Sequence, residues 1–189
     1  MKRLIIFFLA AVTLSSCGYN SMVEKEEGIE AAWAKVETQY QRRSDLIPNI
    51  VETVKGYADF EKETLTGVIE ARSKATSVQV DPSNLSPEAI ANFQKAQSQL
   101  TGALSRLLVT VERYPDLKAS QQFSQLQAQL EGTENRIAVA RDRYNEAVQD
   151  YNSYIRKFPK NLVAGMFDFE KKGYFESDPG TENAPKVDF

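Results

Sequence analysis

Residues 118–156 read KASQQFSQLQAQLEGTENRIAVARDRYNEAVQDYNSYIR, and this stretch decides the fold class. Large apolar side chains recur in it every seven residues, at Phe123, Leu130, Ile137, Tyr144 and Tyr151. A seven-residue apolar repeat is typical of helices that pack lengthwise against partner helices, as in a coiled coil. One helix over this range would be about 58 Å long at 1.5 Å per residue. The stretch therefore predicts an elongated bundle of antiparallel helices.

Three further helices are predicted upstream, because prolines divide the chain into segments of helical periodicity. We expect the first over residues 20–41, where Met22, Ile29 and Val36 form an apolar stripe that Glu26 interrupts. The second ends near residue 76, and the third begins at residue 86, with Ser86 as its N-cap, and stops near residue 114. The predicted fold is all-α, with about four long helices and an irregular, aromatic-rich C-terminal tail over residues 161–189.

The segment 42–51, RRSDLIPNIV, joins the first two helices and has two interpretations. Ser44 or Asp45 can cap a new helix that carries Pro48 in its first turn, where the missing N–H has no cost. Alternatively, one helix continues through the segment and Pro48 kinks it. Both interpretations predict that the chain changes direction near Pro48.

Composition excludes several classes of function. The 189 residues include no histidine and one cysteine, which removes histidine-based catalysis, most zinc sites and internal disulfides. The formal net charge of −3 provides no basic field for nucleic acid, and no phosphate-binding glycine motif occurs. Clustered carboxylates such as Glu24, Glu27 and Glu30 have the chemistry of a glycosidase pair, but their amphipathic setting favours a solvated helix face. We expect no enzyme activity, no cofactor and no metal.

The N-terminus has the features of a targeting segment. Lys2 and Arg3 precede an apolar run over residues 4–14, which is shorter than the roughly 20 residues that a membrane span needs. The run ends in Leu14-Ser15-Ser16-Cys17, which resembles the lipobox of bacterial lipoproteins. The resemblance implies cleavage before Cys17 and lipid attachment to its thiol. The alternative is an ordinary secretory signal with an incidental cysteine.

A longer resemblance covers nearly all of the remaining chain. The segment 42–51, followed by Val54-Lys55-Gly56-Tyr57-Ala58, is similar to the signature of the LemA family. Matching elements follow in order: Glu70-Ala71-Arg72, Tyr114-Pro115-Asp116-Leu117-Lys118-Ala119, Thr133-Glu134-Asn135-Arg136-Ile137, Ala140-Arg141, Tyr144-Asn145, Tyr151-Asn152 and Phe158-Pro159. The resemblance implies an extended helical bundle held at a membrane by its N-terminus, without an established reaction. Many members carry histidine where this chain has Phe60.

Polar residues of this signature are the candidate site. They are Arg43, Asp45, Asn49, Glu134, Arg141 and Asn145, together with Asn152. They can form a cluster that binds a ligand. They can equally be structural, with Asp45 capping a turn, Glu134 and Arg141 each pairing with a neighbouring helix, and asparagines satisfying backbone groups at the kink. The aromatic side chains of the tail also have two possible roles: they can pack on the bundle, or they can dock a protein or lipid.

These observations predict a lipoprotein of the cell envelope with three parts: a signal peptide (1–16), a helical bundle (17–160) and the tail (161–189). We expect the lipid to anchor it to a membrane, with the bundle facing the periplasm. The expected function is a scaffold or adaptor for protein–protein contacts, with self-association as a further possibility. The alternative is a sensor that recognises a small ligand or peptide near Arg43–Asn49.

Overall fold

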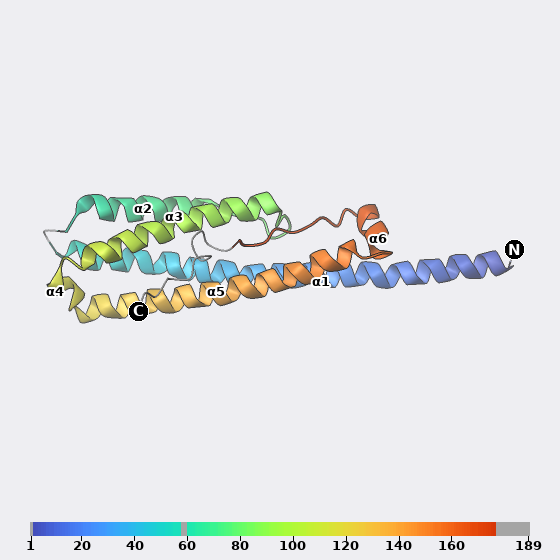
Figure 1. Ribbon diagram of the computed structural model, residues 1–189, viewed down its shortest axis with the longest axis horizontal. Coiled ribbons are helices and arrows are strands. Elements are labelled where there is room, and N and C mark those ends of the chain that lie inside the picture. The colour runs from blue at the N-terminus through green and yellow to red at the C-terminus, as the bar shows by residue number, and fades with distance from the viewer. Residues whose placement is uncertain (1, 58–59, 177–189) are drawn as a thin grey trace, which may run out of the picture.

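The computed structural model describes residues 2–57 and 60–176, with side chains from residue 18 onward. These residues form no strand and six helices: α1 (Lys2–Lys55), α2 (Lys62–Ser77), α3 (Pro87–Val111), α4 (Pro115–Lys118), α5 (Gln121–Arg156) and α6 (Lys160–Met166). Helix α1 packs along α5, and α2 packs on α3. Figure 1 shows the resulting elongated bundle, from which α1 extends toward the N-terminus. The predicted all-α fold with four long helices is confirmed.

Helix α1 buries one continuous stripe along the bundle. Two rows of side chains at seven-residue spacing form it: Met22, Ile29, Val36, Arg43 and Ile50 in one row, and Trp33, Tyr40, Ile47 and Val54 in the other. None of them is more than 7% exposed. The apolar repeat seen over residues 22–40 therefore continues without a shift for two more turns beyond Pro48.

Of the two interpretations of segment 42–51, the structure shows the continuous helix with Pro48 inside it, and the predicted change of direction comes only after Lys55. Neither Ser44 nor Asp45 caps a helix, and Pro48 lies inside α1 on its exposed side. The helix ends at Lys55, and the chain turns back between there and Lys62, where α2 begins. A proline within a helix costs one hydrogen bond. Ending the helix at Pro48 would instead break the stripe before Ile50 and Val54, so the helix continues.

A side chain from α2 satisfies the backbone group that Pro48 leaves without a donor. In a regular helix the N–H of residue 48 would donate to the carbonyl of Ser44, but proline has no N–H. The Arg72 Nε donates to this carbonyl oxygen at 2.9 Å. Ser44 is buried, so an unpaired carbonyl there would be costly. Arg72 therefore makes the proline tolerable and also fixes α2 against α1.

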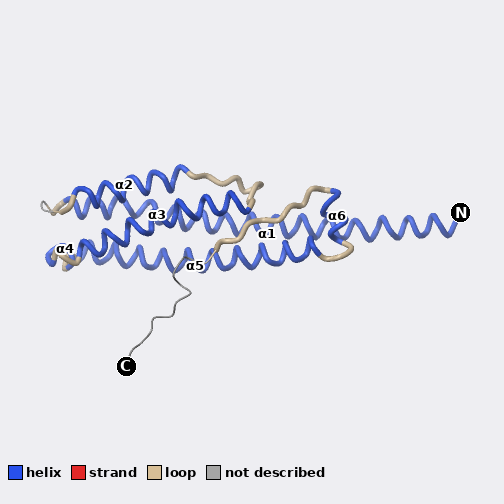
Figure 2. The backbone as a smooth tube through the Cα atoms, turned by 45° about the horizontal axis from the view of Figure 1, so that its top comes forward, coloured by secondary structure: helices blue, strands red, loops and turns tan. Residues whose placement is uncertain are grey.

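The C-terminal tail packs on the bundle as far as residue 176. After α6 the chain runs in an extended path, residues 169–176, which we call the strap; Figure 2 shows it as a loop crossing the helices. Phe175 is buried, whereas Phe167 and Tyr174 are exposed. Ser86 accepts a hydrogen bond from the N–H of Ala89, which confirms the predicted N-cap of α3. Residues 177–189 lie outside the described part of the chain.

The pairing of Arg72 with the carbonyl of Ser44 predicts a dependence between two substitutions. Arg72→Met should lower the free energy of unfolding by about 1–3 kcal/mol, because it leaves a buried carbonyl without a donor. Pro48→Ala supplies the missing N–H and should preserve the helical content. In that background the cost of Arg72→Met should fall by about 1 kcal/mol. Urea unfolding of the four proteins, followed by circular dichroism, measures this coupling.

Arg106→Met removes an exposed arginine of α3 and is the control for loss of charge alone. Its effect should be the same with proline or alanine at position 48. Strict additivity of Arg72→Met and Pro48→Ala would contradict the assigned role of Arg72.

Candidate functional site

A buried arginine occupies the centre of the bundle. The Arg43 side chain is 2% exposed, and its Nη1 donates to Glu134 Oε1 at 3.0 Å and to Thr101 Oγ1 at 2.9 Å. Its Nη2 donates to Gln97 Oε1 at 2.6 Å. The Gln97 amide in turn donates to the carbonyl of Ala75 at 3.3 Å. One guanidinium therefore connects α1, α3 and α5 directly, and reaches α2 through Gln97.

This polar network lies between two apolar clusters. One cluster contains Trp33, Phe93 and Tyr144, and the other contains Ile50, Leu104 and Leu130. Arg43, Gln97 and Glu134 lie between these sets in the order of each helix. Geometry of this kind fixes the register of the helices, because a shift along the axis would leave a buried charge unpaired.

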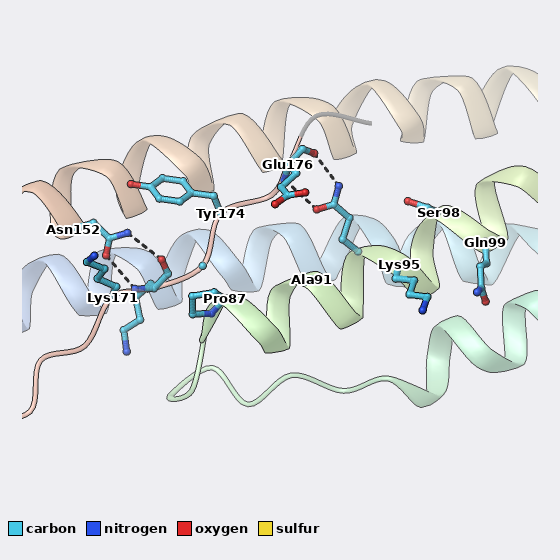
Figure 3. A pocket seen from close by; sticks show the side chains of 12 residues that line it. Pro87, Ala91, Lys95, Ser98, Gln99, Asn152, Lys171, Tyr174 and Glu176 are labelled. Atoms are coloured by element: carbon cyan, nitrogen blue, oxygen red, sulfur yellow. Dashed lines mark hydrogen bonds between the residues drawn. The ribbon is translucent and has the colours of Figure 1, made fainter. Parts of the chain in front are cut away.

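A second set of polar side chains holds the backbone of the strap. Asn152 donates to the carbonyl of Lys172 at 2.9 Å and accepts from the N–H of the same residue at 3.0 Å. Asn145 makes the same pair of bonds with Phe175, both at 2.9 Å. Gln94 of α3 does so with Glu176, at 2.8 and 3.0 Å. Three side-chain amides therefore replace the backbone of a neighbouring β-strand, and Figure 3 shows this strap running between α5 and α3.

Two further bonds fix the middle of the strap. The Tyr144 hydroxyl donates to the carbonyl of Gly173 at 3.0 Å, and the N–H of Gly173 donates to the carbonyl of Leu85 at 2.8 Å. Arg141 donates to the carbonyl of Glu176 at 2.6 Å. A hollow of about 720 Å³ remains beside the strap, bordered by Pro87, Ala91, Lys95 and Tyr174 among others (Figure 3).

The structure divides the candidate residues among several places. Arg43, which is buried, meets the partly exposed Glu134 in the central polar network, whereas Arg141 and Asn145 hold the strap. Asp45 is exposed within α1 and accepts from Gln41 at 2.8 Å. Asn49 is exposed and borders a separate polar hollow between α1 and α5. The asparagines do satisfy backbone groups, but those of the strap and not those near Pro48.

Several residues that build these sites carried no signal in the sequence. Gln94, Gln97 and Thr101 are ordinary polar residues of an amphipathic helix, and only the fold brings them to Arg43 or the strap. Glu26 had a detectable signal, because it interrupts the apolar stripe of α1. It pairs with Lys172 of the strap at 2.6 Å, which explains why a carboxylate stands there.

The part of the chain with described side chains contains no group of three potential metal ligands. No described helix has both the length and the apolar content of a membrane span. The side chain of Cys17, the predicted lipid attachment site, is outside the described residues.

The buried tyrosine on the strap predicts a pH dependence. Burial raises the pKa of Tyr144 above its ordinary value of 10. The folded protein therefore retains a proton that the unfolded chain releases above about pH 10, so this contribution to stability is complete below pH 10 and is lost as the pH rises further. Tyr144→Phe should reduce the fall in the free energy of unfolding between about pH 9 and 11, by up to about 1.4 kcal/mol per pH unit. Urea unfolding across this range measures it.

Tyr174→Phe, at an exposed ring of the strap, is the matched control, and its pH profile should follow the wild type. Identical slopes for wild type and Tyr144→Phe would contradict the prediction.

Comparison with known proteins identifies relatives over nearly the whole chain. A LemA protein of Metamycoplasma hominis is 27% identical over 177 residues, which cover 92% of this chain and 77% of the relative. Magnetosome protein MamQ 2 of Paramagnetospirillum magneticum is 25% identical over 194 residues, covering 93% of this chain and 70% of the relative. The magnetosome protein MamQ of Magnetospirillum gryphiswaldense is also 25% identical, with 93% and 71% covered.

The model of the LemA family matches residues 32–189, a range that includes α2 to α6, the C-terminal part of α1, the buried arginine and the strap. The match agrees with the resemblance that the signature at residues 42–51 first indicated. The chain therefore belongs to the LemA family.

Proposed function

We propose that this protein is a lipid-anchored, non-enzymatic scaffold or adaptor of the bacterial cell envelope. The lipid on Cys17 tethers it, and the bundle presents a long helical surface to protein partners on the periplasmic side. Confinement to a membrane raises the effective concentration of partners in the same membrane, which is how a tether without catalysis acts.

One observation carries the proposal. Four exposed apolar side chains lie at or beside α6 and form what we call the apolar collar: Phe158, Leu162, Met166 and Phe167. Their exposed fractions are 82, 59, 77 and 56%. The ring of Phe167 contacts the ring of Tyr19 at a centroid distance of 4.9 Å. The collar therefore contacts Tyr19, which is two residues after Cys17, the proposed lipid site. It lies at the end of the bundle where α1 emerges (Figure 1).

The collar has the chemistry of a surface that meets a bilayer. Contiguous exposed apolar side chains are uncommon on soluble surfaces and typically mark an interaction site. Lys157 and Lys160 flank the collar, and basic residues beside apolar ones favour the headgroup region of anionic membranes. The lipid on Cys17 holds one point of the chain at the bilayer, so a second contact at this place would orient the bundle relative to the membrane.

The second candidate function is a binding module. Arg43 borders a hollow of about 240 Å³ together with Glu134 and Arg141, but no asparagine lines it. Arg and Asn side chains converge instead at Arg141, Asn145 and Asn152, on the surface beneath the strap. The chain's own strap occupies that surface. A binding function therefore requires the strap to leave or to share it.

The collar predicts an orientation that can be measured. Because lipidation consumes the Cys17 thiol, an engineered cysteine is the only free thiol of the anchored protein. Phe158→Cys carrying an environment-sensitive fluorophore should show blue-shifted emission in membranes and should be quenched by spin-labelled lipids. Val109→Cys is the matched control, since it is also exposed but lies near the far end of α3, next to α4. Equal quenching at both positions would contradict the proposed orientation.

The anchor and the adaptor role share one experiment. Wild type should fractionate with membranes, whereas Cys17→Ala should be released, because it has no thiol to carry lipid. Crosslinking in living cells followed by pull-down should capture a discrete partner with wild type and lose it with Cys17→Ala. Ser16→Ala, which keeps a small residue before Cys17, is the control. Membrane retention of Cys17→Ala refutes the anchor, and capture of self-crosslinks alone narrows the proposal to self-assembly.

A further inference from the structure

We propose that the groove beneath the strap is a peptide-binding groove, and that a partner protein can fill it with an extended segment of the pattern basic–Gly–X–aromatic. The strap groove is lined by Glu26, Pro87, Gln94, Tyr144, Asn145 and Asn152. The inference rests on the proposed adaptor function, to which it adds the chemical class of the partner.

The groove recognises its present occupant mainly through the occupant's backbone. Asn152, Asn145 and Gln94 each bind both the N–H and the carbonyl of one strap residue, and Tyr144 binds a further carbonyl. Recognition of main-chain groups by an array of donors and acceptors is how proteins bind extended peptides. Such bonds do not depend on the identity of the side chains, so an extended segment from another protein can make them equally well.

Three positions of the strap add specificity. The Lys172 ammonium pairs with Glu26. At Gly173 a Cβ would come within 2.6 Å of the Pro87 Cα and within 2.9 Å of the Ser86 carbonyl oxygen, so only glycine fits without a backbone shift.

The third position is Phe175, whose ring is enclosed by other aromatic rings. It stacks on Trp33 with an interplanar angle of 12° and meets Tyr144 edge-on at 5.3 Å. Tyr174, which lies between Gly173 and Phe175 in the sequence, is 44% exposed, so the pattern leaves that position free.

Few side chains of the strap belong to the core. Only Gly173 and Phe175 of its residues are buried, whereas each long helix contributes a full stripe to the core. The hollow beside the strap leaves room along Ala91 and Lys95, where an incoming segment can lie before it displaces the strap (Figure 3). Opening the strap breaks its backbone hydrogen bonds and the packing of Phe175 but leaves the stripes of the long helices in contact, so the helices can stay packed while the strap opens locally.

A partner protein is a better occupant than a second copy of this chain. When two copies exchange straps, each seated strap leaves its own groove, so no contact is gained. The tethered strap also competes at high effective concentration. A partner segment of the same pattern can outcompete the tethered strap if its own affinity or local concentration is higher, and the displaced strap is then free.

The test uses the full chain in mild detergent and a fluorescein-labelled peptide of residues 169–176, FEKKGYFE, as the probe. Gly173→Ala in the protein should expel the strap and open the groove. Fluorescence anisotropy should show the probe binding this variant about tenfold or more tightly than wild type, because the internal competitor is gone. The matched control is the same peptide with alanine in place of glycine, which should bind neither protein.

A variant of the groove keeps the result specific. Adding Asn145→Leu to Gly173→Ala should weaken probe binding about tenfold, because two backbone groups of the probe lose their partners. Phe175→Ala is a second way to open the groove, should Gly173→Ala disturb folding on circular dichroism. Absence of binding to a folded, opened variant overturns the proposal, as does equal binding of the two peptides.

Two further outcomes separate the alternatives. A wild-type dimer on light scattering that Gly173→Ala dissociates would assign the groove to a second copy and overturn the choice of a partner. The binding assay needs no membrane. If the protein binds the probe but does not fractionate with membranes, the anchor is refuted and the groove proposal stands. If the protein fractionates with membranes but its folded, opened variant does not bind the probe, only the groove proposal is refuted.

Discussion

The guanidinium of Arg43 is the group on which the arrangement of the bundle depends. A charge this deeply buried is costly unless it is paired and hydrogen-bonded, and here its partners come from α3 and α5, with α2 reached through Gln97. The apolar stripes on either side permit several alignments of equal burial, since a seven-residue repeat matches itself after two turns. Arg43 allows only one of them. The positions of the groove and the collar follow from that alignment.

Side chains that bond to backbone groups recur throughout the molecule. Arg72 supplies the donor that Pro48 lacks, and Asn145, Asn152 and Gln94 supply the partners that an extended strap would otherwise find in a sheet. Each case is a place where the backbone leaves helical geometry or loses a hydrogen bond inside a packed structure. These bonds fix the course of the strap's backbone while most of its side chains stay exposed. Because the bonds are made to the backbone of the strap, the proposed groove can exchange one extended segment for another.

The collar and the strap lie at related positions along the bundle. Phe169, the first residue of the strap, contacts Tyr19 at 5.5 Å, and Tyr19 also contacts the collar. From there the strap runs along α5 toward Arg141, away from the emerging end of α1 (Figure 2). In the proposed function, the strap groove therefore begins next to the membrane and faces partners that are anchored in it or lie close to it.

The sequence by itself determined the fold class, the four long helices, the N-cap of α3 and the apolar stripes of α1 and α5, because heptad spacing and capping are local properties of a helix. It misplaced the first turn, since the cost of Pro48 is local but the burial of Ile50 and Val54, and the donor from Arg72, are not. The sequence also singled out Arg43, Glu134, Arg141 and Asn145 as one candidate cluster. The structure places the first two in the central network and the last two at the strap. Only the tertiary structure decided which polar groups meet, because a hydrogen bond across helices depends on their relative rotation and register, which no single helix encodes.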